Sequence, residues 1–271
     1  VEIWKAPVNG AGEETRLTQD GKIVRWTPVA SPDGQWAAHS DKSRTLYLTN
    51  TKTGETKAIA KSRNRAFDAF DGLKWSPDSK WLAYSTSAAN NFDQIWIYSL
   101  DSGKATAVTS DRFNSGMPEW SPDGQWLYLV SDRNLKTDVM APWGPRQPEP
   151  HYAKTDKVYQ IALKAGLRSP FSPADELHSD SPAEKPAEKP AEKKDAAVKV
   201  AVDLEGIEQR LQEVPVPAGD YGGLAVTGKS LYLVSADGRR RSLVMYEIKR
   251  KLDPPETIAA DVRGFEMSGD R

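Results

Sequence analysis

A short turn-and-strand motif recurs in this chain at a constant interval, and it restricts the possible folds more than any other feature. The blocks ASPDGQW, WSPDSKW and WSPDGQW have their serines 45 residues apart, at Ser31, Ser76 and Ser121. Equal spacing of similar blocks indicates an internal structural repeat, in which each copy builds one unit of a larger array.

Each block reads as a β-turn that leads straight into a strand. Proline fixes φ at the first central position, aspartate caps the turn with its side chain, and glycine takes the left-handed position after it. This gives the repeated aspartates a structural role, so we expect turn residues, and neither calcium ligands nor catalytic acids, at Asp33, Asp78 and Asp123.

The residues after each turn are WAAHS, WLAYS and WLYLVS, which are apolar almost without a break. Such runs favour strands that are covered on both faces. A recurring tryptophan at the start of these strands favours packing between neighbouring units over an exposed stacking platform. We expect this inter-unit packing at Trp36, Trp81 and Trp126.

Further strands and hairpin turns complete each repeat. Strand-like segments are expected at 45–48, 57–60, 72–75, 95–98, 106–109 and 117–120, with turns at 53–54 and 101–103. Four short antiparallel strands in about 45 residues are typical of a β-propeller blade. No helix-length segment of period 3.6 separates the strands, which argues against an α/β fold. The predicted fold is an all-β propeller of four-stranded antiparallel blades.

The two ends of the chain match only parts of a repeat. Residues 1–6 and 15–18 correspond to the back half of a blade, residues 222–247 form a degenerate fourth repeat, and residues 262–268 begin a further strand. Open sheet edges at both ends would be unpaired. We therefore expect an incomplete propeller segment of a longer protein, with about four blades and partial blades at its ends.

A tract of low complexity interrupts the third repeat. Residues 181–195 contain PAEK three times and no apolar side chain larger than alanine or proline, so they cannot form a core. A solvated loop between two strands of the third blade is expected. The predicted organisation is propeller blades over 1–164, a disordered Pro/Glu/Lys-rich insertion within a blade over 165–200, and the continuation of the propeller over 201–271.

Composition excludes several functional classes. The 37 basic and 38 acidic residues nearly cancel, so no global field recruits nucleic acid or an anionic membrane. No apolar run approaches the roughly 20 residues that span a bilayer. The absence of cysteine excludes disulfides and thiolate metal sites, and it fits a reducing cytoplasm as well as a periplasmic location.

No catalytic constellation is visible. His39 aligns with Tyr84 and Leu129 of the later repeats, which predicts an interior strand residue, whereas His151 and His178 have no partner at ligand spacing. The G-x-S-x-G, H-E-x-x-H and P-loop motifs are all absent. We accordingly predict no catalytic, cofactor-binding or metal-binding residue.

Two other segments could be mistaken for sites. Residues 10–12 (GAG) lack the third glycine and the following helix of a dinucleotide site, so a hairpin turn is expected there. The three arginines at 239–241 follow an Asp-Gly pair and are typical of a solvated hairpin tip, with carboxylate binding as the alternative.

The SPDG-x-W repeats resemble those of TolB, of prolyl-oligopeptidase relatives and of tricorn proteases. A narrower resemblance lies in residues 202–211 (VDLEGIEQRL) and 214–221 (VPVPAGDY), which are similar to the D-L-x-G-I-x-x-R and P-V-P-x-G-x-Y stretches of tricorn protease homologues. In that family two propellers precede a PDZ domain and a serine protease core, and the second, seven-bladed propeller is regarded as a route for peptides.

The resemblance implies a non-catalytic propeller segment that guides or filters peptides toward a downstream protease core. It implies peptides or unfolded polypeptide, the PDZ and protease parts of the parent chain, and further copies of the parent as partners, with no cofactor. It also favours a cytoplasmic location. No catalytic residue carries over to this segment. Two alternatives remain: a TolB-like interaction scaffold without enzymatic activity, and the propeller cap of a prolyl-oligopeptidase-like hydrolase.

Overall fold

The chain forms five antiparallel sheets in the computed structural model, which describes residues 1–19, 21–26, 28–63, 69–137, 152–177 and 198–268. A two-stranded sheet of β1 (Trp4–Lys5) and β2 (Thr15–Arg16) comes first. Blade 1 contains β3 (Val29–Ala30), β4 (Trp36–Ser40), β5 (Thr45–Asn50) and β6 (Thr56–Lys61). Blade 2 contains β7 (Asp71–Trp75), β8 (Trp81–Ser87), β9 (Asp93–Ser99) and β10 (Ala105–Ala107).

The remaining two sheets follow the same order. Blade 3 contains β11 (Ser115–Trp120), β12 (Trp126–Ser131), β13 (Lys157–Ala162) and β14 (Leu211–Glu213). Blade 4 contains β15 (Asp220–Val226), β16 (Ser230–Asp237), β17 (Arg240–Glu247) and β18 (Glu256–Ala260). In every blade the strands pair in chain order, as in a meander.

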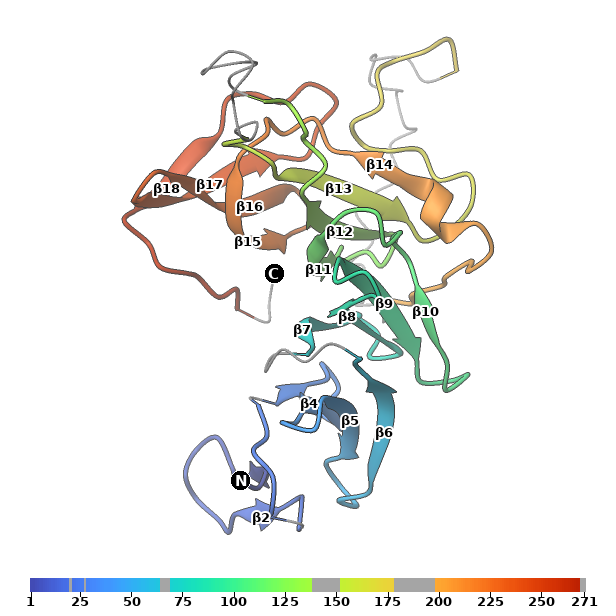
Figure 1. The fold of residues 1–271 in the computed structure, drawn as a ribbon, viewed down its shortest axis with the longest axis vertical. Coiled ribbons are helices and arrows are strands. Elements are labelled where there is room, and N and C mark those ends of the chain that lie inside the picture. Colours follow the sequence, from blue (N-terminus) through green and yellow to red (C-terminus); the bar gives the residue numbers. More distant parts are fainter. Residues whose placement is uncertain (20, 27, 64–68, 138–151, 178–197, 269–271) are drawn as a thin grey trace, which may run out of the picture.

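The blades fan out along an arc (Figure 1), with β7, β11 and β15 on its concave side. These first strands lie next to one another, β11 between β7 and β15. This arrangement confirms the predicted all-β propeller segment of four-stranded antiparallel blades. The two-stranded sheet of β1 and β2 agrees with the partial blade that was expected at the start of the chain.

One expectation for a particular segment is wrong. Residues 262–268 contain no strand, because an extended segment becomes a strand only when its backbone groups pair with a neighbour. Near the two ends of the predicted 165–200 insertion, Phe171 and Val200 are buried. Both residues find apolar partners in the inter-blade core clusters. The tract 181–195, His151 and His178 lie outside the described residues.

The three SPD turns form as predicted. In blade 1 the Ser31 hydroxyl donates to Asp33 Oδ1 at 2.6 Å and accepts the Trp36 amide at 3.0 Å. The Gly34 amide closes the turn on the Ser31 carbonyl at 2.8 Å, with φ of 67° at Gly34. The same bonds recur around Ser76 and Ser121.

Three hydrophobic clusters form the core, and each spans two adjacent blades. Trp36 packs against the cluster shared by blades 1 and 2, Trp81 against that of blades 2 and 3, and Trp126 lies within that of blades 3 and 4. The predicted inter-blade packing of these tryptophans is confirmed. The core therefore lies between the sheets, and each blade depends on its neighbours for burial.

A second set of tryptophans links the first strands directly. The indole Nε1 of Trp75 donates to the Val29 carbonyl of the preceding blade at 3.0 Å. Trp120 repeats this bond to the Lys74 carbonyl, also at 3.0 Å. Lys74 Nζ in turn pairs with the buried Glu119 carboxylate at 2.8 Å, so blades 2 and 3 are joined at their inner strands by both contacts.

The SPD turns of neighbouring blades are also connected. Between blades 1 and 2, the Asp33 amide donates to the Ser79 hydroxyl at 3.1 Å. Between blades 2 and 3, Gly124 stands where Ser79 stands in the previous copy, and residues 198–200 fill the space instead. The Val200 amide donates to Asp78 Oδ2 at 2.8 Å, and Val200 packs against the face of Gly124. We call residues 198–200 the return segment.

Candidate functional site

A pocket of about 220 Å³ lies where the inner strands of blades 2, 3 and 4 begin. It is at the opposite end of these strands from the SPD turns, because β7 and β11 run from the pocket toward the turns. The loops that follow β8 and β12 also end there. Its lining comes from all three blades, including Asp71, Asp93, Met117, Asp132, Asp156 and Tyr221.

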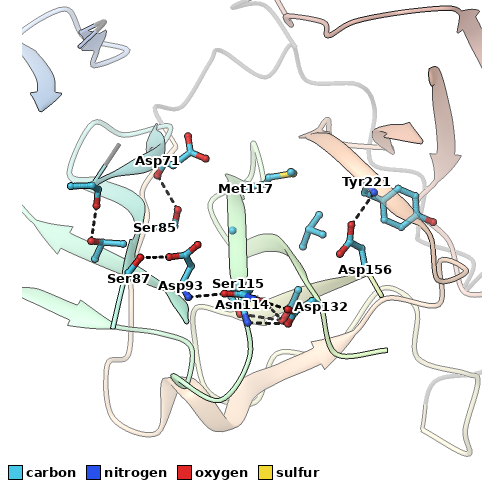
Figure 2. A pocket seen from close by; sticks show the side chains of 15 residues that line it. Asp71, Ser85, Ser87, Asp93, Asn114, Ser115, Met117, Asp132, Asp156 and Tyr221 are labelled. Atoms are coloured by element: carbon cyan, nitrogen blue, oxygen red, sulfur yellow. Dashed lines mark hydrogen bonds between the residues drawn. The ribbon is translucent and has the colours of Figure 1, made fainter. Parts of the chain in front are cut away.

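Four aspartates make the pocket acidic, and each of them takes part in hydrogen bonds (Figure 2). Asp93 Oδ1 accepts the Ser87 hydroxyl at 2.6 Å. Asp132 accepts the amide and the side chain of Asn114 at 2.9 and 2.7 Å. Asp71 accepts the amide of the next residue at 2.7 Å, and Asp156 accepts the Tyr221 amide at 3.0 Å.

No lysine or arginine is among the described residues that line this pocket. Arg133 lies beside this lining, with its guanidinium Nε donating to the Ser131 hydroxyl at 3.0 Å. The four carboxylates outnumber this charge, and carboxylates gathered in a concave site focus a negative potential, which attracts cations. The pocket can therefore receive a cationic or hydrogen-bond-donating group. Among the described residues, no group of three or more His, Asp or Glu side chains could hold a metal ion.

The repeat register relates two of the four aspartates, Asp93 and Asp156, to each other. Trp81 and Trp126 are equivalent in the repeat, and each pairs with one residue of the third strand of its blade. Asp93 and Asp156 precede those paired residues by the same number of positions, so they occupy equivalent positions at the start of the third strand. The corresponding residues of blades 1 and 4 are Arg44 and Arg241. Residue types alone did not reveal this site, because the aspartates are far apart in the sequence and belong to no motif.

Asp156 also joins blades 3 and 4. Its backbone exchanges hydrogen bonds with Gly219 at 3.0 and 3.1 Å, and its side chain accepts the Tyr221 amide. Burial is the main cause that raises the pKa of Asp156 above its ordinary 3.8, and the Tyr221 hydrogen bond partly opposes it. The charges of Asp220 and Asp132 raise this pKa further.

Asp156→Asn is expected to stabilise the protein at pH 7. Because the folded-state pKa is raised, the folded state binds the proton more tightly, and stability is lost as pH rises from 3.8 through the folded pKa. The amide cannot ionise, yet it still offers an oxygen to the Tyr221 amide. Denaturation midpoints from pH 3 to pH 8 should show an advantage of the variant that grows with pH. A constant difference would show that Asp156 does not titrate in this range.

The other described residues considered from the sequence do not line this pocket. His39 is fully buried, with Nε2 2.9 Å from Thr49 Oγ1 and its ring stacked on Tyr47, which confirms the predicted interior position. Residues 10–12 lie in the hairpin turn between β1 and β2, as expected. Arg239 lies in the turn between β16 and β17, Arg240 and Arg241 begin β17, and all three are exposed.

The residues with the family resemblance, 202–211 and 214–221, lie in the connection from blade 3 to blade 4. It contains the 3-10 helix η2 (Ile207–Arg210). The Arg210 guanidinium donates to the carbonyls of Ala162 and Glu205 at 2.8 and 2.7 Å, and also to that of Asp203. The Tyr221 hydroxyl donates to the Pro217 carbonyl at 2.6 Å. These side chains fix a loop conformation, and Tyr221 in addition lines the pocket.

Comparison with known proteins decides the family. The sequence pattern of the tricorn protease second beta propeller domain matches residues 2–271. This chain belongs to that family. Tricorn protease homolog 1 of Streptomyces coelicolor is 26% identical to it over 98% of this chain and 25% of the relative. A match to the Tol-Pal system protein TolB of Alcanivorax borkumensis is 37% identical over 60 residues, or 22% of this chain and 14% of TolB.

A solved structure shows the same fold. A crystal structure of the tricorn protease superposes with a TM-score of 0.73 at 18% identity, covering 97% of this chain and 25% of that one. The predicted resemblance to tricorn protease homologues, and more broadly to TolB-like repeats, is thus confirmed. The tricorn propeller chain spans about a quarter of the length of the Streptomyces relative and of the solved structure. In the described residues, no helix is long and apolar enough to cross a bilayer.

Proposed function

We propose that this tricorn propeller segment guides or filters peptides on their way to a protease core in the full-length protein. The observation that carries the proposal is the pocket of fixed carboxylates at the ends of three neighbouring inner strands. The first strands of a propeller border its central channel. A peptide that enters the channel at this end therefore meets the carboxylates of Asp71, Asp93, Asp132 and Asp156.

The chemistry of the pocket suits a peptide. Peptides carry an amino-terminal ammonium, backbone N–H donors and often lysine or arginine, and all of these interact favourably with carboxylate oxygens. Because hydrogen bonds from Ser87 and Asn114 already orient Asp93 and Asp132, little reorganisation accompanies binding. Exposed charge pairs contribute only about 0.2–1 kcal/mol each. Weak contacts of this kind favour passage over retention.

Removing carboxylates from the pocket should weaken the binding of cationic peptides. We expect the double variant Asp71→Asn/Asp132→Asn of the full-length protein to bind a fluorescent lysine-rich peptide about 2- to 30-fold more weakly, which is the effect of two exposed charge pairs. A serine protease inhibitor should be present so that the peptide is not consumed. Fluorescence anisotropy at low and high salt measures the change, and the loss should shrink at high salt.

A matched control separates the pocket from net charge. Asp101→Asn removes an exposed aspartate beyond the other end of β9, near the SPD turns, where Asp101 lies 3.3 Å from Lys80. It should leave peptide affinity unchanged. Equal losses in the control and the pocket variant, or no loss in either, would contradict the proposed role of the pocket. A TolB-like scaffold for folded partners would then be the better reading.

A further inference from the structure

Each inner strand that borders the pocket carries a β-bulge at the same place. The register between the first two strands shifts between Asp71 and Lys74 in blade 2 and between Gly116 and Glu119 in blade 3. In blade 4 it shifts between Tyr221 and Leu224. Bulges re-aim side chains and are frequent beside functional sites. Here they occur in three blades in a row, at the edge of the same cavity.

The residue at the bulge differs between the blades. In blade 2 it is Gly72, with φ of 59°. The shift in blade 4 spans Gly222 and Gly223, and neither of these has a positive φ. In blade 3 the equivalent position is Met117, with φ of 53°. Glycine adopts such a conformation freely, whereas a residue with a long side chain is strained. The other described non-glycine residues with positive φ lie outside strands, at Arg44, Ser79, Asn91 and Asp261.

The strained position places the methionine side chain in the pocket. Met117 lines the cavity, and Figure 2 shows it between Asp71 on one side and Asp156 with Tyr221 on the other. The neighbouring bulges are in close contact there, since a Cβ on Gly72 would lie 2.7 Å from Pro118 Cδ and 3.7 Å from the Met117 α-carbon. The thioether is thus held among carboxylates at the place where two inner strands approach each other.

Packing alone does not account for this residue. Met117 is only partly buried and touches the edge of the cluster shared by blades 3 and 4, and its counterpart in blade 2 is a glycine that needs no side chain. Backbone strain that persists beside a cavity points to a function for the strained residue. Methionine is flexible and polarizable, so it adapts to apolar side chains of different shapes.

We propose that Met117 is a specificity-determining residue, which contacts an apolar side chain of the peptide next to the cationic group that the aspartates attract. This inference rests on the proposed function. The preferred peptides carry an aliphatic or aromatic residue adjacent to a lysine, an arginine or the amino terminus. Peptides with a serine in place of the apolar residue lose the contact with Met117 but keep the charge attraction.

Two peptides and two variants test the inference in the full-length protein with its protease inhibited. The peptides are lysine-rich and identical except for leucine or serine beside the lysines. The unmodified protein should bind the leucine peptide about 5- to 10-fold more tightly by fluorescence anisotropy. Met117→Gln keeps the length of the side chain and adds polarity, and it should reduce this preference to less than twofold. Met117→Leu should retain most of it.

Met117→Gly adds a readout that a purely structural role would not give. It removes the strained side chain, so the thermal midpoint should stay the same or rise while the preference for leucine disappears. A lower midpoint with an unchanged preference, in Met117→Gly or Met117→Gln, would overturn the inference. Equal binding of both peptides by the unmodified protein would overturn this inference but leave the proposed function standing. Failure of both peptides to bind would overturn the proposed function with it.

Discussion

Gly124→Ala is expected to lower the free energy of unfolding by about 2–5 kcal/mol. Two effects add up at this glycine of the third SPD turn. Its φ of 68° lies in the left-handed region, which costs other residues about 1–2 kcal/mol. A new Cβ would also lie 2.8 Å from Val200 Cγ2 and 3.2 Å from Val198 Cγ1, and such overpacking costs about 1–3 kcal/mol.

The first SPD turn supplies the matched control. Gly34 has nearly the same φ, 67°, but no atom lies within 4 Å of the place where its Cβ would stand. Gly34→Ala should therefore cost only the backbone contribution of about 1–2 kcal/mol. Urea denaturation followed by circular dichroism measures both variants. Equal losses would mean that the return segment does not press on the third turn.

The same pair of glycines shows what the sequence could predict. The SPD turn forms from a few adjacent residues, whose bonds depend only on proline, aspartate and serine chemistry, so its geometry follows from the motif alone. The contact of Gly124 with Val200 joins residues that are distant in the chain, and the low-complexity tract 181–195 lies between them. Local chemistry cannot specify such a contact, and we did not predict it.

The tryptophans also include contacts that the sequence predicts and contacts that it does not. A recurring tryptophan at the start of the second strand indicated packing between blades, and Trp36, Trp81 and Trp126 confirm it. The indole hydrogen bonds of Trp75 and Trp120 to the preceding blade were not foreseen, although both residues stand in the WSPD blocks. Their bonds depend on how closely two first strands approach, and this distance is set by the packing of whole sheets.

The candidate site was the least predictable part. No sequence motif marks Asp93, Asp132 or Asp156. The register of the repeat is the only sequence feature of their strands that points to the site. The third strands of blades 2 and 3 carry aspartates at equivalent positions, and this equivalence follows from strand pairing and not from a motif. Their convergence with Asp71 requires the radial arrangement of the blades, which brings the same end of each sheet to one cavity.

Trp120→Ala is expected to destabilise the protein by about 3–5 kcal/mol. The Trp120 side chain is buried, with 4% of the residue exposed, and lies in the core cluster shared by blades 2 and 3. Truncating a buried tryptophan removes its apolar contacts and leaves a cavity, which accounts for a loss of this size. Loss of the hydrogen bond from the indole N–H to the Lys74 carbonyl, 3.0 Å long, adds to the cost.

Two variants divide this loss into its causes. Trp120→Phe keeps most of the apolar volume but removes the indole donor, so it should cost less than the alanine variant while exceeding the roughly 1 kcal/mol of a typical hydrogen bond. Trp4→Ala truncates a tryptophan that is 54% exposed in the two-stranded sheet, and it should cost less than about 1 kcal/mol. Urea denaturation followed by circular dichroism compares the three. If Trp120→Ala costs no more than Trp4→Ala, the joint between blades 2 and 3 does not depend on this side chain, and the inner strands must be held together by the Lys74–Glu119 pair and the rest of the shared core.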